Sequence, residues 1–81
     1  MNVEQAKSWL EEHQSLVSYY ESKDHNTPFL VSRLPINNAL ISNPLFPKII
    51  AQAATIMEKK RFTSFSEPFE SESGLYFHRL S

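Results

Sequence analysis

Histidines are the side chains of this chain best suited to acid–base or metal chemistry, and there are three of them in 81 residues. His13, His25 and His78 are far apart in the sequence, no pair has the His-x-x-x-His spacing, and the chain has no cysteine. His25 follows Asp24, but adjacency in sequence rarely sets a carboxylate against the edge of an imidazole ring. We therefore expect no metal site and no cofactor, and we interpret His13 as a partly buried histidine with one hydrogen-bond partner.

Serines and carboxylates show no catalytic pattern. No serine lies in a Gly-x-Ser-x-Gly turn, and the single glycine, Gly74, leaves no glycine-rich loop that could hold phosphate. Glu11 and Glu12 are neighbours, so they point to different parts of a helix surface rather than toward each other across a cleft. The sequence therefore predicts a protein that is not an enzyme, and a small enzyme without a recognisable motif is kept as a second alternative.

A basic run near residue 60 combines cations with an aromatic ring. Lys59, Lys60 and Arg61 precede Phe62, and such a combination can contact phosphate and stack on a base. The same cations also suit the C-terminal end of a helix, where they stabilise the negative end of the helix dipole. Together with Lys48 they form a candidate basic docking patch, for an acidic protein or, alternatively, for nucleic acid.

The charges are divided along the chain although the net charge is only -1. Residues 1–25 carry two cations against five acids, residues 26–61 carry five cations against one acid, and residues 62–81 carry one cation against three acids. The small net charge argues against a field that would hold nucleic acid or an anionic membrane without specific contacts. The middle of the chain is nevertheless locally basic and both ends are acidic.

The N-terminal residues have the spacing of a helix that buries one face. Apolar residues and His13 recur at intervals of three and four from Val3 to Tyr20, which is a heptad register. The pattern predicts a helix from Val3 to about Ser22, capped by Asn2, with its apolar face against a partner. The predicted partner-binding residues on this helix are Trp9, Leu10, His13, Leu16, Val17 and Tyr20.

Three further segments follow before residue 62. Residues 29–34 lie between prolines and are rich in apolar residues, which predicts a strand. Residues 35–42 are compatible with one helical turn capped by Asn37 or with an apolar loop that plugs the core. A second helix begins at Pro44 or at Pro47, and its apolar residues recur on one face as far as the basic run.

Residues 62–69 and 75–80 have the composition of strands, and a polar turn with the only glycine joins them. Pro68 cannot donate to a strand ladder, so it predicts an edge strand or a bulge. The expected fold is therefore α+β in the order α-β-α-β-β, a single domain over residues 1–81. Its two main helices are expected on one face of a mostly antiparallel, three-stranded sheet, because a sheet face needs a cover.

Size and composition complete the functional expectation. A chain of this length buries only about 60 to 65% of its unfolded surface, and without cysteine it lacks disulfides, so we expect self-association, as in a homodimer, or a protein partner. No apolar run is long enough to span a membrane, and charged residues stand where a signal peptide would be apolar, which predicts a soluble, cytoplasmic protein. We expect a small non-catalytic regulator (inhibitor, adaptor or accessory subunit) that binds protein through an amphipathic helix and exposed aromatics; the alternative is a nucleic-acid-associated accessory protein.

Overall fold

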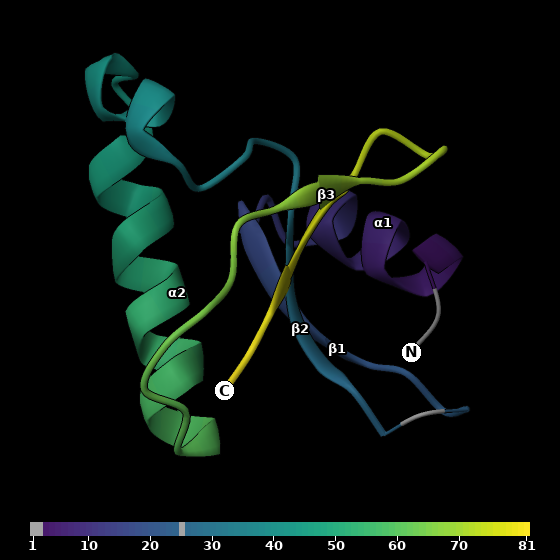
Figure 1. Ribbon diagram of the computed structural model, residues 1–81. Coiled ribbons are helices and arrows are strands. Elements are labelled where there is room, and N and C mark those ends of the chain that lie inside the picture. Colours follow the sequence, from purple (N-terminus) through teal and green to yellow (C-terminus); the bar gives the residue numbers. More distant parts are fainter. Residues whose placement is uncertain (1–2, 25) are drawn as a thin grey trace.

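A computed structural model describes residues 3–24 and 26–81 (Figure 1). The described chain contains two α-helices, one short 3₁₀ helix and four strands. No helix in these residues is both long enough and apolar enough to cross a membrane. In chain order the elements are α1 (Val3–Glu12), β1 (Val17–Glu21), β2 (Pro28–Ser32), η1 (Asn38–Ser42), α2 (Phe46–Lys60), β3 (Phe69–Glu70) and β4 (Tyr76–Arg79).

The four strands form one antiparallel sheet in the order β1-β2-β4-β3. β1 and β2 are a hairpin whose register runs from Val17 opposite Ser32 to Glu21 opposite Pro28. β4 lies on the other side of β2, with Val31 opposite Phe77. The predicted α+β class and antiparallel pairing are confirmed, but the sheet has four strands rather than three, and β1 and β3 are its edges.

The prediction of a single helix from Val3 to Ser22 is wrong, because α1 ends at Glu12 and β1 begins five residues later. Gln14 has a φ of 51°, in the left-handed region that interrupts a helix. The residues that follow it include Val17, Tyr19 and Tyr20, and β-branched and aromatic residues fit a strand when a partner strand is available. The apparent heptad therefore joins residues of two different elements. The predicted cap, Asn2, lies outside the described residues.

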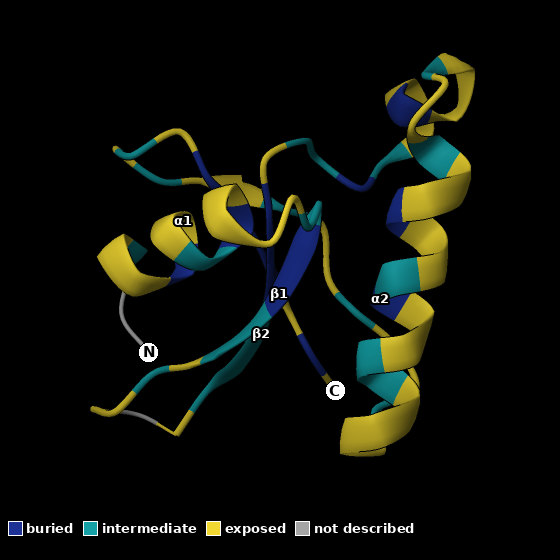
Figure 2. Ribbon diagram, turned by 180° about the vertical axis from the view of Figure 1, so that it is seen from behind, coloured by how far each residue is buried: buried dark blue, intermediate teal, exposed yellow. Residues whose placement is uncertain are grey.

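The two helices cover opposite faces of the sheet, so the prediction that both pack on one face is also wrong (Figures 1 and 2). Successive residues of β2 point to opposite faces: Leu30 belongs to a core beneath α2, and Val31 belongs to a second core beneath α1. Because both faces carry apolar side chains, each one needs its own cover. The result is a sheet between two helices.

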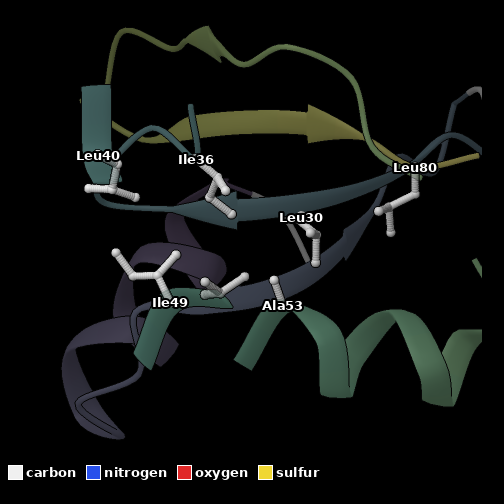
Figure 3. Close-up of a cluster of buried hydrophobic side chains, with 7 residues drawn as sticks. Leu30, Ile36, Leu40, Ile49, Ala53 and Leu80 are labelled. Carbon is white, nitrogen blue, oxygen red and sulfur yellow. The ribbon is translucent and has the colours of Figure 1, made fainter. Parts of the chain in front are cut away.

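The core beneath α2 is closed by the connection between β2 and α2. Asn37 caps η1, since its Oδ1 accepts a hydrogen bond of 3.0 Å from the N–H of Ala39. Ile36 and Leu40 lie on either side of this cap and are buried (Figure 3). Residues 35–42 thus combine the two alternatives that the sequence allowed: they form a helical turn capped by Asn37, and their apolar side chains fill the core. The buried residues of this core are Val17, Leu30, Ile36, Leu40, Ile49, Ala53 and Leu80.

The ends of α2 and β3 refine two further predictions. α2 begins at Phe46, between the two predicted starts, after a turn in which Asn43 Oδ1 accepts the N–H of Leu45 at 2.9 Å. It ends at Lys60, and the C-cap residue Arg61 takes a φ of 63°, so that the N–H of Phe62 can bond back to the carbonyl oxygen of Met57. The strand predicted over residues 62–69 is reduced to β3, which begins at Phe69 directly after Pro68, and to an isolated bridge between Phe65 and Leu80; its predicted position at a sheet edge is confirmed.

Candidate protein-binding groove

One side of β1 is an open edge. β1 pairs with β2 on one side, and no strand of the described residues pairs with it on the other. The hydrogen bond of 2.9 Å from Ser22 N–H to Thr27 C=O fixes the alternation of the hairpin. In an antiparallel pair, backbone groups point alternately toward and away from the neighbouring strand. The N–H and C=O groups of Val17, Tyr19 and Glu21 therefore point away from β2.

Gln52 of α2 anchors the beginning of this edge. Its Oε1 accepts two backbone hydrogen bonds, at 2.8 Å from Leu16 N–H and at 3.1 Å from Val17 N–H. The side chain is half-buried, and it satisfies donors that no neighbouring strand reaches. The outward backbone groups of Tyr19 and Glu21, farther along β1, remain available to another chain.

A groove of about 330 Å³ opens beside the beginning of β1. α1 forms one wall and α2 forms the other, and in Figure 2 β1 lies in front between the two helices. Apolar groups dominate the lining, which suits side chains of a partner rather than a charged metabolite. The lining residues are Trp9 from α1, Ser15 and Val17 at the start of β1, and Ala51, Gln52, Thr55 and Ile56 from α2.

On the α1 side, the groove is lined by the side chain of Trp9, the only tryptophan of the chain. Trp9 is half-buried, and its ring stacks on that of His13 with 4.9 Å between centroids and an angle of 22° between planes. His13 Nδ1 also lies 3.1 Å from the carbonyl oxygen of Trp9, to which it donates. The predicted hydrogen-bond partner of His13 is confirmed, but the side chain is exposed rather than partly buried, because α1 has ended before it.

The structure does not gather the other predicted partner-binding residues on one surface. Trp9 and Val17 line the groove, whereas Leu10 is fully buried in the core beneath α1. Leu16 and Tyr20 are half-buried and pack against different cores. The reason is that the chain leaves the helix before Gln14, so these residues belong to α1, to the turn after it and to β1, whereas the predicted helix would have kept them on one stripe.

Part of the predicted basic patch borders the groove. Lys48, Gln52, Thr55 and Lys59 follow one another at intervals of four, three and four residues, so they lie along one side of α2. Gln52 and Thr55 line the groove, and both lysines are exposed. The two lysines stand about 16 Å apart along the helix, from a rise of 1.5 Å per residue, and flank the α2 wall instead of forming one compact patch.

The rest of the predicted patch lies at the end of α2. Lys60 Nζ stands 4.6 Å from the centre of the Tyr19 ring, and Arg61 is exposed at the helix C-cap. The Tyr19 hydroxyl donates to Glu21 Oε2 at 3.2 Å. Burial raises the pKa of Tyr19 above its usual range, and the hydrogen bond and charge of Glu21 act in the same direction. One cation therefore lies over the open edge at the residue whose backbone faces outward.

His78 is a buried polar residue whose burial was not predicted from the sequence. Its Nδ1 donates to the carbonyl oxygen of Ser66 at 3.2 Å, and its Nε2 accepts the N–H of Ile36 at 3.2 Å. Burial lowers the pKa of His78, although the Ser66 bond and the charge of Glu67 act against it. The alternation that places Leu80 in the core would have placed His78 there too.

Other chemistries find no support in the described part of the chain. Among residues 3–24 and 26–81 no three His, Cys, Asp or Glu side chains are close enough to hold a metal ion. His25, which follows Asp24 in the sequence, lies outside these residues. The candidate site is the groove with the adjoining β1 edge, where apolar side chains lie beside backbone groups that no strand of the described residues pairs with.

Comparison with known proteins gives no match. No protein family, no curated protein and no solved structure is significantly similar to this chain.

Proposed function

We propose that this protein is a non-catalytic, stoichiometric protein-binding module that takes an extended segment of its partner as an added strand along β1. The observation that carries the proposal is the direct continuity between an unpaired strand edge and an apolar groove between two helices. In strand addition, backbone hydrogen bonds supply affinity while pockets for alternate side chains supply specificity. The β1 edge offers the backbone hydrogen bonds, and the groove offers the pockets for side chains.

The two walls define how such a segment would lie. Its backbone would meet the outward groups of Tyr19 and Glu21, and its side chains would alternate between the two faces of the sheet. Those on one face would contact Trp9, and those on the other would contact the α2 wall near Thr55. Aromatic side chains such as Trp9 are common anchors of protein interfaces.

The nucleic-acid alternative has less support. Phe62, the aromatic residue of the basic run, is half-buried and packs against the core beneath α2. It is therefore committed to the fold and does not offer an open ring to a base. Lys48 and Lys59 flank an apolar groove rather than a row of exposed rings, an arrangement better suited to a peptide than to a single-stranded nucleic acid.

The test is selection of random twelve-residue peptides displayed on phage, followed by titration of the selected synthetic peptides. Trp9 reports on groove occupancy, because it is the only tryptophan and lines the groove. Ala51→Glu places a charged side chain in the groove, and Ala54→Glu makes the same change at an exposed position of α2 outside the lining. We expect binding to fall about tenfold or more, or 1.4 kcal/mol, in Ala51→Glu and to persist in Ala54→Glu.

Two results would overturn the proposal. Selected peptides that bind both variants equally well would place the binding site elsewhere, and a selection that yields no binder would remove the reason for a peptide groove. Thermal unfolding of both variants shows that the comparison is made between folded proteins, since exposed helical positions tolerate such changes.

A further inference from the structure

We propose that the segment bound in the groove alternates acidic and apolar residues, with the acids facing α2 and the apolar side chains facing Trp9. This inference rests on the proposed function and adds the chemistry of the partner to it. The two walls of the groove differ in charge, and an added strand presents alternate side chains to them.

The α2 wall carries the positive charge. Lys48 and Lys59 lie on the same side of α2 as the lining residue Thr55, and both are exposed. The only acid of α2, Glu58, follows Ala51 by two turns along the outer rim, so the wall keeps a positive balance. A carboxylate that faces this wall would meet cations on either side of an apolar stretch.

The length of the wall fits a short extended segment. The roughly 16 Å between Lys48 and Lys59 corresponds to about five residues of a strand at about 3.4 Å per residue. Three alternate side chains of such a segment would face α2. The two residues between them would face the other side of the sheet, where Trp9 supplies an uncharged aromatic wall.

A third cation stands over the open edge. Lys60 Nζ lies over the ring of Tyr19 at 4.6 Å, and the hydroxyl of the same ring donates to Glu21. The backbone of Tyr19 faces the incoming strand, so a partner carboxylate opposite this residue would lie near the ammonium group. Charge complementarity of this kind selects a partner and fixes its register.

A second copy of the chain fits the edge less well. Two β1 edges paired about a twofold axis would run antiparallel and would set each α2 beside its symmetry mate. Lys48 of one copy would then lie opposite Lys59 of the other, and facing like charges oppose association. An acidic segment of a different protein has no such repulsion.

The test uses three capped octapeptides: alternating valine and glutamate, alternating valine and lysine, and four valines followed by four glutamates. Binding is followed by Trp9 fluorescence and by calorimetry at 50 mM and 300 mM salt. We expect the alternating glutamate peptide to bind about tenfold more tightly than the other two, and its affinity to fall as salt rises.

Paired lysine variants locate the charge effect. Lys48→Gln combined with Lys59→Gln should weaken binding of the alternating glutamate peptide by about three- to tenfold, since each exposed charge pair contributes only modestly to affinity. Lys7→Gln combined with Lys23→Gln removes the same charge from exposed positions away from α2, and should change the affinity by about twofold or less.

The outcomes separate the inference from the proposed function. Peptides that lose binding in Ala51→Glu but show no preference for glutamate, or for alternation, overturn the inference and leave the groove as the site. A dimer in sedimentation that Ala51→Glu dissociates would make a second copy the occupant and would also overturn it. If binding does not depend on Ala51 in any peptide, the proposed function itself fails.

Discussion

The two edges of the sheet are built in opposite ways. β3 is two residues long, follows Pro68 and leads into a turn rich in serine and glutamate. Short strands, proline and charge are the usual means of protecting a sheet edge from another chain. β1 has five residues, no proline and a single charge, Glu21. One edge is protected and the other is left open.

The surroundings of the two edges differ in the same sense. Next to β3, the chain folds back on β4: Ser66 N–H bonds to Arg79 C=O at 2.8 Å, and Ser81 N–H bonds to Ser64 C=O at 3.0 Å. Next to β1, the flanking elements are two helices with a groove between them. β1 therefore combines an open edge with an apolar groove between helices, whereas β3 combines a short strand with a polar turn.

The largest loss of stability is expected when an apolar side chain of an edge strand is shortened, and the loss should differ between β1 and β3. Val17 of β1 is 1% exposed and Phe69 of β3 is 53% exposed. Val17→Ala should lower the free energy of unfolding by about 2 to 3 kcal/mol, from lost burial and the cavity left behind. Phe69→Ala, although it removes more atoms, should lower it by about 1 kcal/mol or less. Denaturant unfolding measures both, and equal losses would remove the distinction between an integrated and a peripheral edge strand.

The next largest loss of stability is expected when a side chain that accepts hydrogen bonds from a strand backbone is replaced. Gln52 accepts two backbone N–H groups at the beginning of β1, whereas Ser66 Oγ accepts only one, from Arg79 at 2.9 Å. Gln52→Leu should destabilise by about 1 to 3 kcal/mol because partly buried donors lose their acceptor. Ser66→Ala, at an exposed residue, should cost about 0.5 kcal/mol. Chemical denaturation of the pair checks this, and a smaller loss in Gln52→Leu than in Ser66→Ala would contradict it.

A smaller effect on stability, but a large one on binding, is expected from Glu21→Pro. The N–H of Glu21 points away from β2 and its side chain is exposed, so proline should change the free energy of unfolding by about 1 kcal/mol or less. It removes an outward donor, so groove-binding peptides should weaken about tenfold. Glu21→Ala removes the carboxylate but keeps the N–H, and should retain binding. Equal affinities of the two variants would argue against strand addition.

The parts of the fold that the sequence predicted correctly are those set by local signals. The spacing of Phe46, Ile49 and Ala53 marks one face of α2, and Asn37 caps η1, as one of the two alternatives for this segment allowed. β1 was missed because Val17 and Tyr20 also satisfy the helical spacing of α1. Only the pairing with β2, a contact between distant residues, decides in favour of the strand.

The candidate site was predicted only in part, for the same reason. Trp9 and Val17 were identified, but as neighbours on a helix rather than as parts of two elements around a groove. Gln52 carries no sequence signal, since its role depends on the N–H groups of β1. An open edge is a property of the whole sheet and cannot be read from the residues of one strand.

The last prediction concerns His78, which supports the protected side of the sheet and has no effect through charge at neutral pH. Its folded pKa is lowered by burial below the usual 6.5. As pH falls below about 6.5, the unfolded chain takes up a proton that the folded protein does not, so stability falls until pH reaches the folded pKa.

Protonation of His78 would also break the bond from Ile36 N–H to Nε2. Below pH 6.5 the protection of the Ile36 N–H against hydrogen exchange, relative to its intrinsic exchange rate, should therefore fall before the protection of Ser18 and Tyr20 falls. Comparing unfolding between pH 7.5 and 5 in His78→Gln and in His13→Gln, an exposed control, should show that only the first loses this part of the pH dependence. If His78→Gln does not fold, an NMR titration of the ring in the unaltered protein decides, and a pKa at or above 6.5 would contradict the prediction.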